Sequence, residues 1–247
     1  MVRGLVKTYV TGFDEDILRG GIPQGHVVLI SGPSGTMKSS FCLSVLYQNA
    51  LHGVPGLYFT LEQTAGSLLE HAASLGFRMP AVSGLLPILD LSSGRARFET
   101  AARHIQEMTG GSRMPDTPTL AILKGKIREL HGQLGFQLLA IDSWDALELI
   151  LGFEDRRAET FAFFEWLREL AVTSLLIFEE PELEASPDAL EEEFLSDGII
   201  HLRMASVTET SFQRRIQCVK MRSVNHNSDF RTLLFENGRF EIARAMG

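Results

Sequence analysis

The sequence has 247 residues, of which 45% are hydrophobic and 22% are charged, an ordinary composition for a globular protein. No apolar run reaches the roughly 18–20 residues that span a bilayer, and the start is too polar for a signal peptide, so we expect no membrane segment. Cys42 and Cys218 each stand in an apolar stretch. This placement predicts buried thiols in a reducing, cytoplasmic compartment.

The net charge of −8 argues against a protein whose main task is to hold nucleic acid, because that affinity comes largely from basic residues that neutralise phosphates. Eight acidic residues lie between Phe178 and Phe194 alone. We interpret this segment as a solvated acidic loop, which would repel a nucleic-acid backbone nearby.

Short runs rich in apolar and β-branched residues predict strands at 26–31, 56–61, 136–141 and 174–178. Segments with helical spacing of apolar residues predict helices at 39–51, 68–75, 122–134 and 160–170. Strands that alternate with helices favour an α/β fold, in which a mostly parallel central sheet has helices on both faces. The stretch 109–119, with two glycines and two prolines, predicts an exposed loop.

After Asp197 the pattern changes to strands without intervening helices, at 198–204, 212–220, 231–235 and 239–242. Asn237-Gly238 predicts a tight turn between the last two. We therefore expect a C-terminal antiparallel β extension on the parallel core. No repeat or low-complexity linker divides the chain, so we expect a single domain over residues 1–247.

The most informative motif follows the first predicted strand, where a glycine-containing loop leads into Lys38-Ser39 and a helix. Strand, loop and helix in this order are typical of a phosphate-binding loop, whose backbone N–H groups and helix N-terminus face the phosphates of a nucleoside triphosphate. Lys38 would contact the β- and γ-phosphates, and the Ser39 hydroxyl would bind Mg²⁺. The residues that we expect to bind ATP are Gly32, Ser34, Gly35, Thr36, Met37, Lys38, Ser39 and Ser40.

One position departs from the usual loop, in which glycine stands immediately before the lysine. Here that residue is Met37, which we expect to adopt a helical backbone conformation while its side chain adds bulk near the β-phosphate. This departure puts affinity and turnover in question more than the site itself. The alternative is an ordinary turn that happens to contain Lys-Ser.

Carboxylates follow two further strands, at the edge where parallel strands place chemistry. Asp142 closes one strand and is followed by Ser143, a pattern typical of an acid that supports the magnesium ion through its water shell. Glu62 closes the strand after the phosphate-loop helix and is our candidate for activating the attacking water. Alternatively, Glu62 only complements the dipole of the helix that begins near Thr64.

The run Glu179-Glu180-Pro181-Glu182 also follows an apolar strand and is similar to the acidic pair of transporter-type ATPases. No sequence typical of their helical subdomain accompanies it, and Asp142 already fills the magnesium role. We therefore assign no catalytic role to this run.

Together these motifs resemble the KaiC-like branch of RecA-superfamily P-loop ATPases over nearly the whole chain. Thr11-Gly12, followed by Gly20-Gly21-Ile22-Pro23-Gln24-Gly25, is similar to the first conserved segment of that family. The phosphate loop, Glu62 and Ile141-Asp142-Ser143 follow in the family's order. Asp197-Gly198-Ile199-Ile200-His201-Leu202 and the segment from Lys220 to His226 resemble its D-G-I-I-x-L and K-M-R-G-x-x-H motifs.

The resemblance implies a RecA-fold ATPase that forms a ring of identical subunits, expected to be a hexamer, with ATP and Mg²⁺ at each interface. It implies that Lys220 and Arg222 reach the γ-phosphate of the neighbouring subunit, as an arginine finger does. Met221 and His226 would lie near that nucleotide, and Ser74 on the second helix would contact one. Without the resemblance, Lys220 and Arg222 are two solvated cations at the end of an edge strand.

Departures from the family pattern limit these implications. The family usually has two consecutive glutamates after the second strand, whereas Gln63 follows Glu62 here, which predicts slow turnover. The circadian member of the family has a Ser-Thr pair where this chain has Glu193 and Phe194, so autophosphorylation there is not supported. That member also has two tandem ATPase domains. We therefore do not extend a clock function to this chain.

Three functions are compatible with the sequence. The first is a ring-forming ATPase with Glu62, Lys38, Lys220 and Arg222 as catalytic residues and an unidentified signalling partner. The second is an ATP-binding regulatory module with little turnover, of which Met37 and Gln63 would be the marks. The third is a nucleic-acid motor on the same fold, against which the acidic charge counts.

Overall fold

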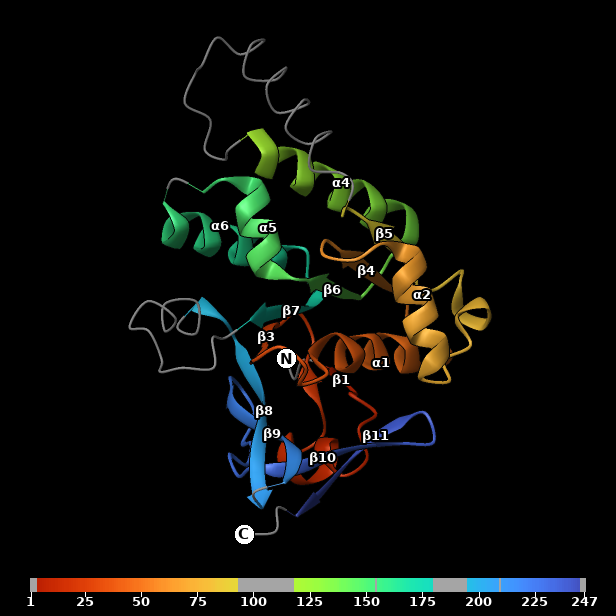
Figure 1. Cartoon of the computed structure of the whole chain (residues 1–247). Helices are drawn as coiled ribbons and strands as arrows, with labels where there is room; N and C mark the ends of the chain where they lie inside the picture. Colours follow the sequence, from red (N-terminus) through yellow and green to blue (C-terminus); the bar gives the residue numbers. More distant parts are fainter. Residues whose placement is uncertain (1–3, 93–117, 154, 180–194, 209, 245–247) are drawn as a thin grey trace.

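The structure is a computed structural model that describes residues 4–92, 118–153, 155–179, 195–208 and 210–244. Its centre is a nine-stranded sheet with the order β11-β10-β9-β8-β3-β7-β6-β4-β5 (Figure 1). The strands of this sheet are β3 (Val27–Gly32), β4 (Gly56–Thr60), β5 (Ile88–Asp90), β6 (Leu138–Asp142), β7 (Thr173–Glu179), β8 (Gly198–Thr208), β9 (Ser211–Met221), β10 (Arg231–Glu236) and β11 (Arg239–Arg244). A separate two-stranded sheet joins β1 (Leu5–Val6) and β2 (Ile22–Pro23).

Helices cover both faces of the parallel part of the sheet, as expected. The helical segments are a π-helix (Phe13–Ile17), α1 (Lys38–Leu51), α2 (Ala65–Ser74), a 3-10 helix (Met79–Val82), α4 (Pro118–Leu134), α5 (Trp144–Leu151) and α6 (Arg156–Glu169). In Figure 1, α4, α5 and α6 lie on one side of the strands and α1 and α2 on the other. This is the RecA-like P-loop fold that the sequence predicts.

Two clusters of buried apolar side chains hold the layers together. The alternation along β3 shows how: Val28 and Ile30 join the cluster under α1 and α2, whereas Val27 and Leu29 join the cluster under α4, α5 and α6. Because both faces are buried, the strand reads as a continuous apolar run rather than an alternating one.

Three helices begin at side chains that accept a hydrogen bond from a backbone N–H in the first turn. Thr64 caps α2, Ser143 caps α5 and Asp155 caps α6. Ser143 directly follows Asp142, the last residue of β6, and Thr64 follows β4 after a short loop that carries Glu62.

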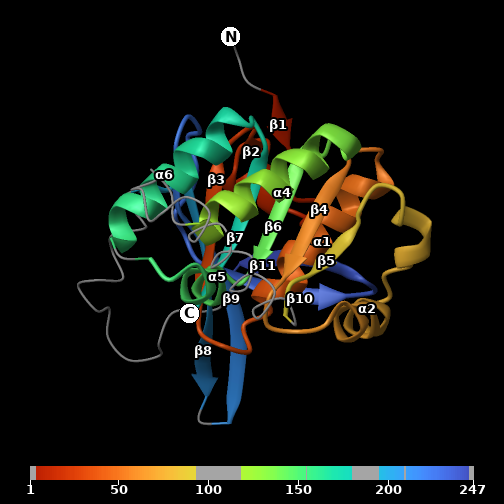
Figure 2. The ribbon, with the colours of Figure 1, turned by 90° about the horizontal axis from the view of Figure 1, so that it is seen from above.

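The C-terminal strands form the expected antiparallel extension, with β9 paired to β8 and β10 paired to both β9 and β11. The β8–β9 hairpin is longer than predicted and runs past the end of the parallel sheet (Figure 2). The Asn237-Gly238 turn lies between β10 and β11, and both residues have positive φ, as a tight hairpin turn requires.

Some elements differ from the sequence-based expectation. The short strand β5, helix α5 and the π-helix were not predicted, and α4 begins at Pro118, inside the stretch expected to be a loop. Residues 109–117 and the acidic residues 180–193 lie outside the described residues. Both cysteines are buried free thiols, as predicted. No helix in the described ranges is both long and apolar enough to cross a membrane.

Candidate functional site

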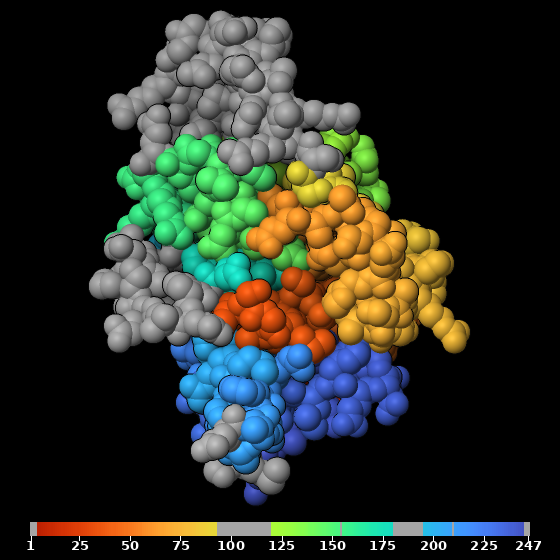
Figure 3. Space-filling model, viewed as in Figure 1, coloured from red at the N-terminus to blue at the C-terminus, as the bar shows by residue number. Residues whose placement is uncertain are grey.

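The carboxyl ends of β3, β4, β6 and β7 meet around a cavity of about 330 Å³. Its position is where an open parallel sheet binds ligands. The lining residues are Ser34, Gly35, Met37, Lys38, Ser39, Ser40, Glu62, His71, Asp142, Ser143, Ile177 and Glu179. On the face shown in Figure 3, the orange-red start of α1 is flanked by the gold α2 and by the blue C-terminal strands.

The phosphate loop has its tight geometry because of two glycines. Gly32 has a φ of 141°, and a Cβ atom there would lie 1.9 Å from the backbone oxygen of Leu202 in β8. Gly35 has a φ of 79°, but a Cβ atom there would meet nothing within 4 Å. The loop is closed by the Thr36 hydroxyl, which donates to the Pro33 carbonyl at 2.8 Å. Gly32 therefore sets how closely β8 approaches the loop.

Met37 corrects one expectation, because its backbone is in the left-handed region rather than in a right-handed helical conformation. Its φ is 73° and its ψ is 29°, at the N-cap of α1. This region costs an L-residue other than glycine roughly 1–2 kcal/mol, which explains why glycine is usual here. The Met37 side chain is half-buried and packs against the apolar cluster under α1. That contact helps to offset the backbone strain.

Lys38 is the first residue of α1 and its ammonium group is turned back onto the loop. Its Nζ atom donates to the carbonyls of Gly32 at 2.7 Å and Pro33 at 2.8 Å. Burial lowers the pKa of Lys38, while the carboxylates of Glu179, Asp142, Asp145 and Glu62 oppose that shift. A cation surrounded by backbone carbonyls and four acidic groups is well placed to exchange these contacts for phosphate oxygens.

Asp142 is the buried carboxylate beside the lysine. It accepts a hydrogen bond from the Tyr58 hydroxyl at 2.6 Å and another from the Ser39 side chain. Burial raises the pKa of Asp142, and the two hydrogen bonds oppose this shift. The pairing of Ser39 with Asp142 brings together a hydroxyl and a carboxylate, two of the oxygen ligands that suit Mg²⁺.

Glu62 lies at the mouth of the cavity and is exposed to solvent. One of its carboxylate oxygens accepts a hydrogen bond from the Ser143 hydroxyl, which also caps α5. Glu62 precedes the cap of α2 by two residues, and no acidic residue occupies the first turn of that helix. Its observed partner is thus Ser143, across the cavity from α2.

Four residues that line the cavity were not predicted as site residues, namely His71, Ser143, Ile177 and Glu179, and Tyr58 supports the site from outside this lining. Tyr58 and Ser143 hold the carboxylates of Asp142 and Glu62, and no sequence pattern identifies such supporting hydroxyls. His71 faces the cavity from α2 and contacts Ser40. Glu179 belongs to the acidic run to which we assign no catalytic role, yet it lines the cavity. It ends β7 as Asp142 ends β6, and this position at a strand end is the signal that could have identified it.

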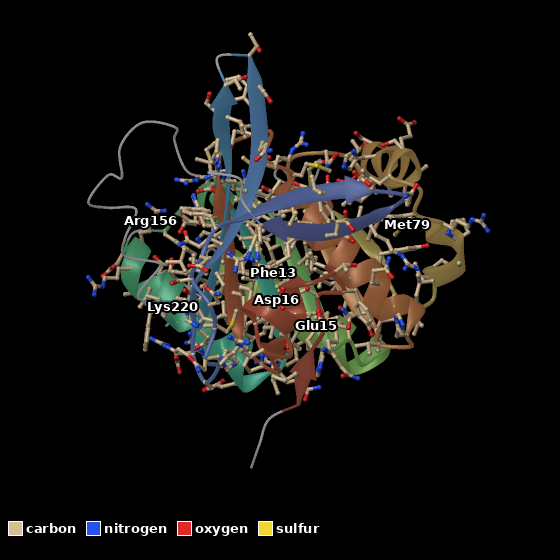
Figure 4. All side chains as sticks on the ribbon, turned by 90° about the horizontal axis from the view of Figure 1, so that it is seen from below. Phe13, Glu15, Asp16, Met79, Arg156 and Lys220 are labelled. Carbon is tan, nitrogen blue, oxygen red and sulfur yellow. The ribbon has the colours of Figure 1, made fainter. Side chains whose placement is uncertain are left out.

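The other predicted residues lie at the opposite edge of the sheet. Because β9 is antiparallel to β8, its last residue, Met221, pairs with Gly198, which itself pairs with Val28 at the start of β3. Lys220 donates to the Ser196 carbonyl at 2.7 Å, and the half-exposed Arg222 forms an ion pair with Asp197 at 3.2 Å. Figure 4 labels Lys220, which lies far from the tip of the hairpin.

Two further predicted residues stand apart from the cavity. The imidazole of His226 lies 3.4 Å from the Val224 carbonyl, in the turn after β9. Ser74 is exposed at the end of α2, and its hydroxyl donates to the His71 carbonyl at 2.7 Å. Neither residue is among those that line the cavity in the described part of this chain.

The sequence of the chain matches a known protein family. The family described as "ATPase: KaiC" matches residues 6–244. This chain belongs to the KaiC family of ATPases. It is 32% identical to the circadian clock oscillator protein KaiC 1 of Synechocystis sp. over 90% of its length, and 32% identical to KaiC2 of the same organism over 94%. The chain spans only 40% and 39% of those two relatives.

A solved structure covers the chain more evenly. The crystal structure of a KaiC-like protein from the archaeon Pyrococcus horikoshii OT3 matches with a TM-score of 0.76 and 25% identity, over 98% of this chain and 99% of that one. The KaiC family of ATPases implies a nucleotide with Mg²⁺, and the residues present fit both. The Lys38 ammonium group is a donor that suits phosphate oxygens, and the Ser39–Asp142 pair suits the metal.

The described residues contain no group of three or more histidine, cysteine or acidic side chains that could hold a metal ion. A protein cage of that kind is not needed for Mg²⁺ beside a nucleotide, because the ion keeps several waters and takes further oxygens from the phosphates.

Proposed function

We propose that this chain hydrolyses ATP with Mg²⁺ and does so as a ring of identical subunits. The observation that carries the proposal is the convergence of Lys38, Asp142 and Glu62 on one cavity at the carboxyl edge of the sheet. Membership of the KaiC family of ATPases supports it.

The proposed roles follow from the contacts. Lys38 would leave the Gly32 and Pro33 carbonyls to bind the β- and γ-phosphates. Ser39 and Asp142 would hold Mg²⁺, which when bound neutralises charge on the phosphate oxygens. Glu62, fixed by Ser143 at the mouth of the cavity, would orient the water that attacks the γ-phosphorus and accept its proton.

The location of Lys220 and Arg222 supports action on a neighbouring subunit. They lie beside the start of β3, whereas the phosphate loop follows its end. Lys220 pairs with Ile199, which pairs with Leu29, so Lys220 lies two strands away from β3 and about 10 Å along it from Gly32 at the usual rise. This separation is longer than either side chain, which supports contact with the phosphates of another copy of the chain.

A substitution of Glu62 tests hydrolysis. Glu62→Gln should lower the rate of phosphate release at least about 100-fold while leaving ATP affinity within a factor of about three, because the base is lost but the phosphate contacts stay. Glu70→Gln is the matched control, since Glu70 is exposed on α2 and does not line the cavity. An unchanged rate for Glu62→Gln would contradict the assignment.

Met37 and Gln63 support a second candidate, an ATP-binding regulatory module with little turnover. The strained Met37 sits where the β-phosphate is expected, and Gln63 replaces the second glutamate of the family pattern. This candidate predicts that purified protein retains ATP and releases phosphate at the background rate. Measuring bound nucleotide and phosphate release on the same preparation separates the two candidates.

A further inference from the structure

Beside the phosphate loop there is a hydrogen-bonded pair that the proposed mechanism does not use. Ser40 is in the first turn of α1, two residues after Lys38, and is buried. Its hydroxyl lies 2.8 Å from Nε2 of His71, which stands in the last turn of α2. Both residues line the cavity.

The neighbourhood fixes this pair from both sides. Leu68 and Ala72 of α2 are buried in the same apolar cluster as Phe41 of α1, so the two helices hold a constant separation at this point. Within the described residues, the Ser40 hydroxyl has no hydrogen-bond partner other than His71. The imidazole therefore decides in which direction the hydroxyl proton points.

We propose that His71 is a positioning residue for nucleotide binding, which donates from Nε2 to the Ser40 oxygen and thereby directs the Ser40 proton at the phosphates. A hydroxyl has one proton and accepts through its lone pairs, so an N–H that occupies a lone pair leaves the proton for another acceptor. The first turn of α1 already favours negative charge through its free N–H groups. The inference rests on the proposed binding of ATP at this cavity.

The benefit of the arrangement is pre-organisation. A serine near a helix start otherwise tends to donate to a backbone carbonyl one turn earlier, and such a hydroxyl would have to rotate before it met a phosphate. Hydrogen bonds to charged groups are worth roughly 1.5–3 kcal/mol, about ten- to a hundredfold in affinity. A part of this gain depends on the proton being directed beforehand.

Calorimetric ATP affinities of four variants test the pair. His71→Phe keeps a ring but has no donor and should weaken ATP binding about tenfold, as should Ser40→Ala. His71→Gln should bind within about a factor of three of the unmodified protein, because its amide N–H₂ can donate from nearly the place of Nε2. The double variant should bind no more weakly than either single variant. Additive losses, or an unchanged affinity for His71→Phe, would overturn the proposal.

Two controls separate this inference from other causes. His131→Phe, on α4 away from the cavity, should leave ATP affinity unchanged. Lys38→Ala should abolish ATP binding, and ATP binding that survives this substitution would contradict the proposed function. If Lys38→Ala abolishes ATP binding but His71→Phe leaves it unchanged, only the role of His71 is contradicted. Nitrogen-15 NMR of the unmodified protein should find the proton of His71 on Nε2. A proton on Nδ1 alone would contradict the proposal whatever the variants do.

Discussion

The two edges of the parallel sheet treat charge in opposite ways. At the carboxyl edge, Lys38 and Asp142 are buried, and burial shifts the pKa of each toward its neutral form. At the amino edge, burial also raises the pKa of Asp197, but hydrogen bonds from Arg168 and from the Val27 N–H, with the nearby cations, outweigh it and lower that pKa. The carboxyl edge therefore disfavours the charged forms of Lys38 and Asp142, whereas the amino edge stabilises the charged form of Asp197.

The difference follows from which partners each edge supplies. Asp197 accepts from Arg168 at 2.8 Å, from Val27 at 3.0 Å and from Arg222 at 3.2 Å, so α6, β3 and the residue that follows β9 converge on one carboxylate. Across the described residues, Lys38 and Asp142 form no ion pair, and they contact carbonyls and hydroxyls instead. At the amino edge Asp197 is paired with cations of the same chain, whereas at the carboxyl edge the side chains of Lys38 and Asp142 form their hydrogen bonds with uncharged groups.

The substitution with the largest expected effect disturbs the contact between the phosphate loop and β8. Gly32→Ala would place a methyl group 1.9 Å from the Leu202 oxygen, so β8 would have to separate from β3. We expect a loss of more than about 4 kcal/mol in the free energy of unfolding, because backbone cannot move aside as a side chain can. Gly35→Ala has the same positive φ but open space, and should cost only about 1 kcal/mol. Urea denaturation of both proteins measures the contrast, and equal losses would refute the steric explanation.

The next largest effect is expected when one buried carboxylate at each edge is replaced by its amide. Asp197→Asn should lower the free energy of unfolding by about 2–3 kcal/mol, mainly through Arg168, since the half-exposed Arg222 is screened by water. Asp142→Asn should instead raise stability slightly in the absence of nucleotide, because it removes a buried charge. Asp229→Asn, whose exposed carboxylate pairs with Arg231, should change stability by less than about 0.5 kcal/mol.

The pH dependence of these two variants should have opposite signs. The pKa of Asp197 is lowered, so its contribution is complete above 3.8 and is lost as the pH falls through the folded-state value. The pKa of Asp142 is raised, so the penalty of its charge is present at neutral pH and disappears as the pH falls toward 3.8. Thermal melts from pH 7 to pH 3 should show the deficit of Asp197→Asn and the advantage of Asp142→Asn both shrinking. A pH-independent difference would contradict the ionic origin.

The smallest expected effect concerns Met37. Alanine normally stabilises a helical site relative to glycine, but a left-handed residue reverses this order. Met37→Gly should therefore be more stable than Met37→Ala by about 1 kcal/mol, since both lose the same apolar contact and only alanine keeps the strain. Chemical denaturation of the pair measures the difference. The usual order, with alanine more stable, would show that the backbone of Met37 is not left-handed in solution.

The sequence predicts the carboxyl edge well because its features are local. A strand, a loop with Gly32 and Gly35 and the start of α1 are contiguous. Asp142 closes β6 and Glu62 lies two residues after β4, and the apolar pattern of both strands is visible in the sequence. The order of elements then places these ends at one edge of a parallel sheet. Met37 was found by comparison with the usual loop, but its left-handed backbone was not, since sequence alone does not report φ.

The remaining parts depend on contacts between distant residues. His71 and Ser40 are 31 residues apart, and Arg168 and Asp197 are 29 apart, so neither pair has a signature in the chain. The strand β5 has three residues, too few for a periodic pattern, and the helix α5 follows a strand end so closely that its start was read as part of the site motif. Supporting hydroxyls such as Tyr58 are identified only by the fold.

We propose that the phosphate loop of one copy and the cations of another make one site. Mixing two inactive variants tests it most directly: Lys38→Ala retains Arg222 but has a disabled loop, and Arg222→Ala retains the loop but lacks the cation. In a randomly mixed closed ring at equal amounts, about a quarter of the interfaces combine an intact loop with an intact Arg222. We expect ATP hydrolysis to reappear on mixing, at about a quarter of the unmodified rate. Two variants that stay inactive after confirmed subunit exchange, or an Arg222→Ala protein that is fully active alone, would contradict it.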